Sequence, residues 1–426
     1  MVKSRFPTVS TVFVLCGVLA FSVAACTGEA GDGGDIDSGA PEGSGGSGTG
    51  GAAAGVGGMT GAGGASGVAG SMTTGQGGAS SGVGGNLGTA GMIVGTGGAR
   101  GSGGVSGSGG VTGSGGSTSG AGGSTTSANC TATPVNPNAT PQAKKLLCYL
   151  YSLYGNHVLS GQQETSWNNP ANDITYYTSM IGKAPAILGG DYLYPSGTSS
   201  RAIAYWNAGG ITMIRYHMGA PPNADSYANA MGSANLDNVV KAGTTENTSF
   251  NQKLDYVATQ IGMLQAANVP LLWAPFHEVQ PNGWFWWAKG TGAQYAALWR
   301  YMYNYLTSTK GLNNILWLLP FSGSPNAAYY PGKAFVDIGG PDTYATNPPF
   351  SSNYNSARTI LGTTMPIALH ETGTIPQPST MFPTAAPWLL FNVWAGFETS
   401  ANTVATLTSA YNSPFTITRD EVPSLK

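Results

Sequence analysis

The feature that most constrains this chain is the stretch at residues 271–287, which reads LLWAPFHEVQPNGWFWW. Its first residues form a continuous apolar run without helical periodicity, which is typical of a short strand buried on both faces. The run ends at His277 and Glu278, and a loop with proline and Asn-Gly turn signals follows. Four aromatic residues come directly after this loop. The sequence therefore predicts a buried strand that delivers a carboxylate to a loop beside an aromatic wall.

A second stretch, residues 365–371, repeats this pattern. The sequence MPIALHE is again a short apolar run that stops at a glutamate, Glu371, and a Thr-Gly pair then turns the chain. Two buried strands thus each end in one glutamate.

The last ~300 residues alternate between strand-like and helix-like segments, which indicates a parallel sheet with right-handed crossovers. The expected strands are residues 157–163, 184–193, 211–218, 269–277, 315–321, 334–344, 366–371 and 389–397. The expected helices are residues 141–154, 173–183, 251–268, 293–310, 352–361 and 402–411. Eight such units predict an α/β protein with a closed (β/α)₈ TIM barrel, and a doubly wound open sheet is the alternative.

The barrel is favoured by where the polar residues fall. Seven of them lie at or near the ends of seven different expected strands: Gln162, Asp191, His217, Glu278, Tyr344, Glu371 and Trp394. Only a barrel gathers the carboxyl ends of all its strands around one pocket.

The N-terminus resembles an export signal. Lys3 and Arg5 precede an apolar segment at residues 9–25, and Val-Ala-Ala-Cys26 closes it in the manner of a bacterial lipobox. We therefore expect residues 1–26 to be a lipoprotein signal with Cys26 lipidated. The alternative is an ordinary cleaved signal with an incidental cysteine. Either way we expect an exported protein, which is either anchored by lipid to the cell envelope and displayed from the outer membrane, or secreted.

Residues 27–128 consist almost entirely of glycine, serine, threonine and alanine. Such a segment buries too little apolar area to offset the entropy cost of ordering its backbone. We expect a flexible linker with a root-mean-square span on the order of 55 Å, followed by one catalytic domain at residues 129–426.

Cys130 and Cys148 are the only cysteines in this expected domain. In an exported protein, two cysteines so placed favour a disulfide over a metal site or a catalytic nucleophile. The bridge would fasten the entry of the domain to its first helix, with a stabilisation of about 3 kcal/mol.

The formal net charge of the chain is -2, with 8% charged and 10% aromatic residues. No excess of basic side chains is available for phosphates, so we do not expect a nucleic-acid partner. A charge-poor, aromatic-rich surface suits a neutral ligand.

Paired carboxylates at the ends of barrel strands match the chemistry of glycosidic bond cleavage. One carboxyl protonates the leaving oxygen while the other attacks the anomeric carbon. A rim salt bridge would explain either glutamate alone, but both together, with His277 and an aromatic wall beside one of them, favour catalysis.

The motifs WAPFHE…GWFWW, VDIGGPDTY and PIALHETG occur in order, and over about residues 140–426 the chain resembles glycoside hydrolase family 26. The best-known members of this family are endo-β-1,4-mannanases on a retaining (β/α)₈ barrel. The resemblance implies that Glu278 is the acid/base and Glu371 the nucleophile, and it implies no cofactor or metal. The resemblance also implies that Tyr344 hydrogen-bonds the nucleophile, that His217 and His277 line the sugar subsite at the cleavage point of a mannan-type polysaccharide, and that Trp284 and Trp394 form its walls. We expect Asp191 to bind the substrate as well.

Two departures from the family pattern concern specificity. Many members read His-Glu-Met-Asn-Gly where this chain has an altered loop at residues 279–283, and His370 replaces a small hydroxyl residue. Strand alternation points His370 away from the face of Glu371, so we expect it to pack. The loop leaves a β-1,3-xylanase or a mixed-linkage β-glucanase open as alternatives. A non-catalytic sugar-binding surface lipoprotein is the alternative from another class.

The tryptophans divide into two expected groups. Trp284 and Trp287 follow the polar loop and should stack on sugar rings, because an indole face matches the C–H face of a pyranose. Trp286 and Trp299 should pack inside the fold. We expect a monomer that contacts the membrane only through its lipid.

Overall fold

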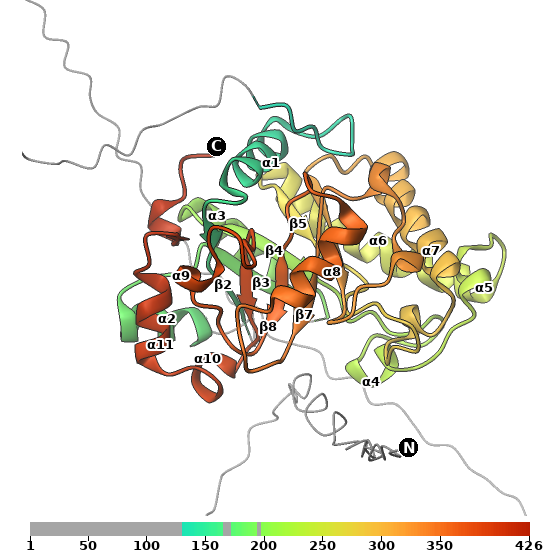
Figure 1. The fold of residues 1–426 in the computed structure, drawn as a ribbon. Helices are drawn as coiled ribbons and strands as arrows, with labels where there is room; N and C mark the ends of the chain where they lie inside the picture. The colour runs from blue at the N-terminus through green and yellow to red at the C-terminus, as the bar shows by residue number, and fades with distance from the viewer. Residues whose placement is uncertain (1–129, 165–171, 194–196) are drawn as a thin grey trace, which may run out of the picture. The chain divides into compact units, whose positions relative to one another are not determined.

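The computed structural model of the chain describes residues 130–164, 172–193 and 197–426 (Figure 1). The expected signal, the lipidated Cys26 and the linker lie outside the described residues. Their boundaries therefore stay predictions.

Eight parallel strands form a closed barrel in chain order, from β2 to β9. Pairing of Gln162 with Val393 joins the last strand to the first. The barrel expected from the strand pattern is confirmed, and the open sheet is wrong. The strands are β2 Gly161–Gln163, β3 Ile187–Asp191, β4 Ile211–Arg215, β5 Leu271–Trp273, β6 Ile315–Phe321, β7 Ile338–Thr343, β8 Leu369–Thr372 and β9 Phe391–Val393.

Helices surround the barrel (Figure 1). Several of the longer helices begin at a capping residue. The side chain of Thr244 accepts from the Asn247 N–H at the start of α6, and Thr291 and Gln294 form a reciprocal capping box at the start of α7. The longer helices are α1 Pro141–Leu153, α2 Asn172–Ile181, α3 Thr198–Asn207, α6 Thr245–Ala266, α7 Gly292–Asn304, α8 Ser351–Leu361 and α11 Val404–Tyr411. The short elements are α4 Tyr227–Ala230, α5 Leu236–Val240, η1 Trp286–Ala288, η2 Tyr305–Thr309, η3 Ala327–Tyr329, η4 Lys333–Phe335, α9 Pro378–Met381, α10 Phe397–Ser400 and η5 Arg419–Glu421.

Helix α3 was not expected from the sequence. It begins with Thr-Ser-Ser after a glycine with φ of 85° and has no side-chain cap. Its buried face, which includes Ala202, Tyr205 and Trp206, packs against β3 and β4. Tertiary burial therefore stabilises a segment whose local sequence signals for a helix are weak.

The N-terminal entry of the domain is fixed at the amino end of the barrel. The disulfide between Cys130 and Cys148 is present, and it fastens the entering chain to α1 as expected. Next to it, β1 (Val158–Leu159) pairs with β10 (Thr416–Ile417) in a small parallel sheet. The opposite, carboxyl end of the barrel is left for the loops that follow the strands.

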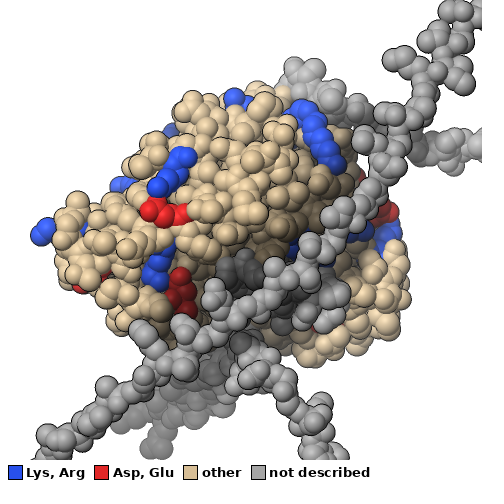
Figure 2. Space-filling view, turned by 180° about the vertical axis from the view of Figure 1, so that it is seen from behind, with Lys and Arg blue, Asp and Glu red and all other residues tan. Residues whose placement is uncertain are grey.

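The surface carries few charges. On the face shown in Figure 2, lysine and arginine side chains are scattered among neutral residues and do not gather into a patch. Among the described residues, no helix combines the length and the apolar character needed to cross a membrane.

Candidate active site

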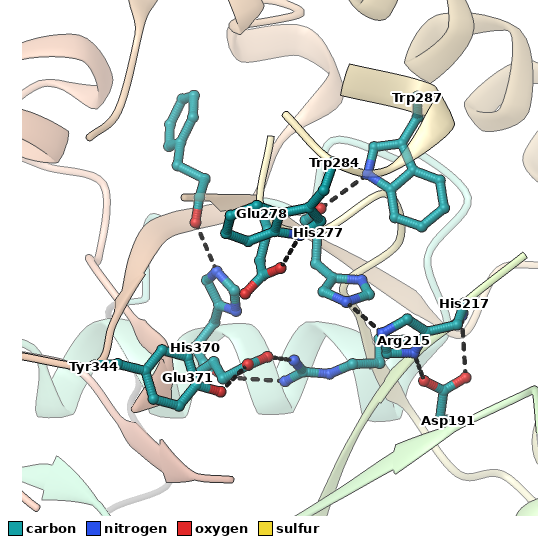
Figure 3. Close-up of polar contacts among 11 residues, drawn as sticks. Asp191, Arg215, His217, His277, Glu278, Trp284, Trp287, Tyr344, His370 and Glu371 are labelled. Carbon is teal, nitrogen blue, oxygen red and sulfur yellow. Dashed lines mark hydrogen bonds and ion pairs between the residues drawn. The ribbon is translucent and has the colours of Figure 1, made fainter. Parts of the chain in front are cut away.

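Glu278 lies just beyond the end of β5, where the backbone changes direction. Phe276 and Glu278 both adopt left-handed conformations, with φ of 51° and 57°, at a cost of about 1–3 kcal/mol each for residues other than glycine. A bridge between Val279 and Phe321 on β6 fixes the turn. The turn buries the Glu278 carboxylate at the carboxyl end of the barrel, where the indole N–H of Trp284 donates to its Oε2 at 2.7 Å (Figure 3).

Glu371 lies on β8 and is fully buried. The Arg215 guanidinium, from β4 on the far side of the barrel, forms an ion pair with one oxygen of Glu371, and the Tyr344 hydroxyl donates to the other (Figure 3). A second Arg215 nitrogen donates to the His370 carbonyl at 3.0 Å. Close strand packing helps to place Glu371, because a Cβ at Gly340 on β7 would lie 1.8 Å from the Ala368 carbonyl oxygen. The expected bond from Tyr344 to the proposed nucleophile is therefore present.

Asp342 on β7 completes a group of three carboxyls with Glu278 and Glu371. One oxygen from each lies within 4.8 Å of the other two. Burial, and next the neighbouring Glu278 carboxylate, raise the pKa of Asp342 well above its usual value. The spacing between Glu278 and Glu371 is close to the ~5–5.5 Å between the two catalytic carboxyls of retaining glycosidases, and it is shorter than the ~6.5–9.5 Å found in inverting ones.

The same three carboxyls have the spacing of a cation site. Oxygens of the two glutamates already accept from Trp284, Arg215 and Tyr344. Arg215 thus supplies a fixed positive charge inside the cluster. We assign no metal to it.

Asp191, His217 and His277 form a chain of hydrogen bonds beside the carboxyl cluster. The Nδ1 of His217 bonds to Asp191 Oδ2, and its Nε2 lies 3.1 Å from Nε2 of His277. Although burial opposes it, the bonds from His217 hold the pKa of Asp191 below its usual value. Burial lowers the pKa of His277 well below its usual value, so this ring is neutral. Asp191 therefore orients His217, and contact of either histidine with a sugar stays a prediction.

The aromatic residues differ in exposure. Trp284 and Trp394 are half-buried. The Cζ atom of the Arg215 guanidinium lies 5.0 Å from the centre of the Trp394 ring. Stacking by Trp287 on a sugar is wrong, because its indole is fully buried, stacks on Phe285 at 4.6 Å and donates to the His277 carbonyl. The loop turns this ring inward to support His277.

Trp286 and Trp299 are fully buried, as expected for packing residues. His370 is also buried, and its Nε2 bonds to the Phe321 carbonyl at 2.8 Å, which agrees with a packing role. Burial lowers the pKa of His370 to about 3, so the ring stays neutral.

Gln162 does not face the pocket, although its place near a strand end suggested it. Its Oε1 accepts from the Tyr177 hydroxyl of α2 at 2.8 Å, and its amide donates to Glu398 of α10. The alternation of β2 turns this side chain toward the helical layer.

Arg215 and Asp342 were missed by sequence reasoning. Arg215 ends the apolar strand at residues 211–215, and Asp342 comes two residues before Tyr344. A lone charged residue at the end of a buried barrel strand is the signal that could have identified both.

Comparisons with known proteins agree with the barrel fold. A family model described as glycosyl hydrolase family 26 matches residues 135–421. The chain is 33% identical over 305 residues to a mannan endo-1,4-beta-mannosidase of Thermothelomyces thermophilus, covering 66% of this chain and 61% of that protein.

Two solved structures have a similar fold. One is a GH26-CBM35 beta-(1,4)-mannanase of Podospora anserina, with a TM-score of 0.62, 32% identity and 69% of each chain covered. The other is GH26A of a Muricauda species, with a TM-score of 0.62, 31% identity, and 68% of this chain and 100% of that chain covered. The chain spans 61%, 49% and 52% of the length of three mannanase relatives that it matches.

Proposed function

The chain belongs to glycosyl hydrolase family 26, and from this premise we propose that it is a retaining glycoside hydrolase that cleaves β-1,4-mannosidic bonds in mannan-type polysaccharides. The observation that carries the proposal is the close pair of buried glutamates at the carboxyl end of the barrel, each with its own hydrogen-bond donors.

In the first step, a carboxylate oxygen of Glu371 attacks the anomeric carbon while Glu278 donates a proton to the leaving glycosidic oxygen. The C–O bond breaks, and a covalent glycosyl-enzyme forms. Arg215 and Tyr344 hold the nucleophile in place for the attack.

In the second step, Glu278 takes a proton from water, whose oxygen attacks the anomeric carbon and releases Glu371. Two displacements return the original anomeric configuration. Trp284 donates a hydrogen bond to Glu278. This bond stabilises the Glu278 carboxylate, which forms in the first step and takes up a proton in the second.

Substitution separates the two roles. Glu371→Ala should abolish activity on every substrate. Glu278→Ala should still cleave aryl mannosides with good leaving groups, because these need no proton in the first step, and azide should accelerate it. Failure of azide to rescue Glu278→Ala, or an inverted product anomer, would contradict the proposal.

The altered loop at residues 279–283 makes the substrate a separate question. Mannan, glucomannan, β-1,3-xylan and lichenan should be offered to the chain side by side, with the products sized. We expect mannan and glucomannan to be cleaved. Preference for β-1,3-xylan or lichenan would support the alternatives within the family, and binding without cleavage would support the non-catalytic lipoprotein.

We also propose that a lipid on Cys26 and a flexible linker at residues 27–128 present a monomeric catalytic domain outward from the outer membrane to a polymer. A linker spanning on the order of 55 Å gives the domain reach from the membrane. Cys26→Ser should abolish incorporation of a palmitate analogue. Protease treatment of intact cells should release the domain, and protection until lysis would place it in the periplasm.

A further inference from the structure

Asp342 lies inside the proposed catalytic cluster without a role in the two-step scheme. It is 4% exposed, and its position on β7 is in register with Glu371 on β8. One of its oxygens lies within 4.8 Å of oxygens of both glutamates. Three carboxyl groups therefore share a small buried volume.

Oxygens of Asp342 and Glu278 lie within 4.8 Å of each other, and both residues are buried. Two ionised carboxylates this close repel each other and can only accept hydrogen bonds, so a proton on one of them removes the repulsion and provides a donor to the other. Among the donors around the cluster, Trp284 donates to Oε2 of Glu278, and Arg215 and Tyr344 donate to Glu371.

The charges around Asp342 come from three other elements of the barrel. The Glu278 carboxyl follows β5, the Glu371 carboxyl lies on β8, and the Arg215 guanidinium extends from β4 to Glu371 (Figure 3). Arg215 pairs directly with Glu371 and offsets its negative charge. The neutral His370 ring adds no charge of its own. The like charge that acts most directly on Glu278 is therefore that of Asp342.

We propose that Asp342 and Glu278 hold one proton between them, so that Asp342 is a positioning residue that keeps Glu278 able to donate this proton near neutral pH. The raised pKa of Asp342 supports this pairing. The inference rests on the proposed function, because it assumes that Glu278 is the acid/base.

The proton balance follows the two displacement steps. The shared proton passes from Glu278 to the leaving oxygen as the glycosidic bond breaks, and both carboxyls are then ionised. Their repulsion makes Glu278 a stronger base toward the attacking water, whose proton restores the shared state.

The test is Asp342→Asn in the full chain, with kcat/KM measured against pH on a soluble β-1,4-mannooligosaccharide. Asparagine keeps the shape and a donor but cannot ionise, so the last proton on Glu278 should be lost at lower pH. We expect the alkaline limb of the curve of kcat/KM against pH to shift to lower pH by about one unit or more, which is the coupling typical of interacting sites.

Two controls separate this effect from a structural one. An aryl mannoside with a good leaving group needs no proton for the first step, so its alkaline limb should not move. Asp337→Asn makes the same change at a buried aspartate that accepts from the backbone N–H groups of Val135 and Trp317, and it should leave the limb in place.

If the alkaline limb of Asp342→Asn stays in place or shifts to higher pH, the inference about Asp342 is overturned. Hydrolysis of mannan by the unmodified protein would still support the proposed function in that case. No hydrolysis by the unmodified protein would instead overturn the proposed function itself. Should Asp342→Asn fail to fold, carboxyl ¹³C NMR of the unmodified protein decides. Two resonances that titrate together in two steps support the pair, and ionisation of every carboxyl in single steps below about pH 5 contradicts it.

Discussion

Arg215→Met is expected to destabilise the domain severely because it leaves Glu371 as a buried carboxylate without its cation. Both side chains are at most 1% exposed, and the guanidinium also donates to the His370 carbonyl. Removal of one partner from a buried ion pair costs about 3–5 kcal/mol. For a domain of this size, the loss corresponds to a fall in Tm on the order of 10 °C.

The assay is thermal unfolding of the full chain near pH 7, with two comparison variants. Lys310→Met removes the cation from a pair with Asp255 in which both side chains are exposed by a third or more, so Tm should change little because solvent screens this pair. Arg215→Met combined with Glu371→Gln removes both charges, and it should recover at least about 2 kcal/mol of the loss from Arg215→Met alone.

The pH dependence gives a further check. At a pH low enough to protonate Glu371, the single variant no longer buries an unpaired charge, so its deficit against the unmodified protein should shrink. A loss from Arg215→Met similar to that from Lys310→Met would refute the reasoning. So would a double variant that is no more stable than the single one.

The remaining predictions concern the tryptophans and the disulfide. Trp284→Phe removes the N–H that donates to Glu278, and kcat on mannan should fall roughly 10- to 100-fold, as expected for a bond to a charged group; an unchanged kcat would contradict this role. Trp287→Phe makes the same change at a fully buried ring, so Tm should fall while KM for mannan stays unchanged, and a raised KM would contradict a purely structural role for this indole. Cys130→Ser with Cys148→Ser should cost about 3 kcal/mol of stability without changing kcat, and equal Tm values would show that the bridge contributes nothing.

The barrel and the places of the two glutamates could be predicted from the sequence. Short apolar runs alternating with helical patterns allow few topologies, and in a parallel barrel all strands end at the same face. Glu278 and Glu371, each at the end of such a run, therefore had to approach one another. The disulfide followed from cysteine count and spacing in the same way.

The directions of individual side chains and the pairing of charged groups could not be predicted from the sequence. Gln162 turns to the helical layer, Trp287 is buried under the loop at residues 279–283, and Arg215 crosses the barrel to Glu371. The physical reason is that these directions depend on strand register, on the left-handed turn at Glu278 and on contacts between residues far apart in the chain. Local periodicity specifies that a residue ends a buried strand, whereas the partner of its charge is set by the closure of the barrel.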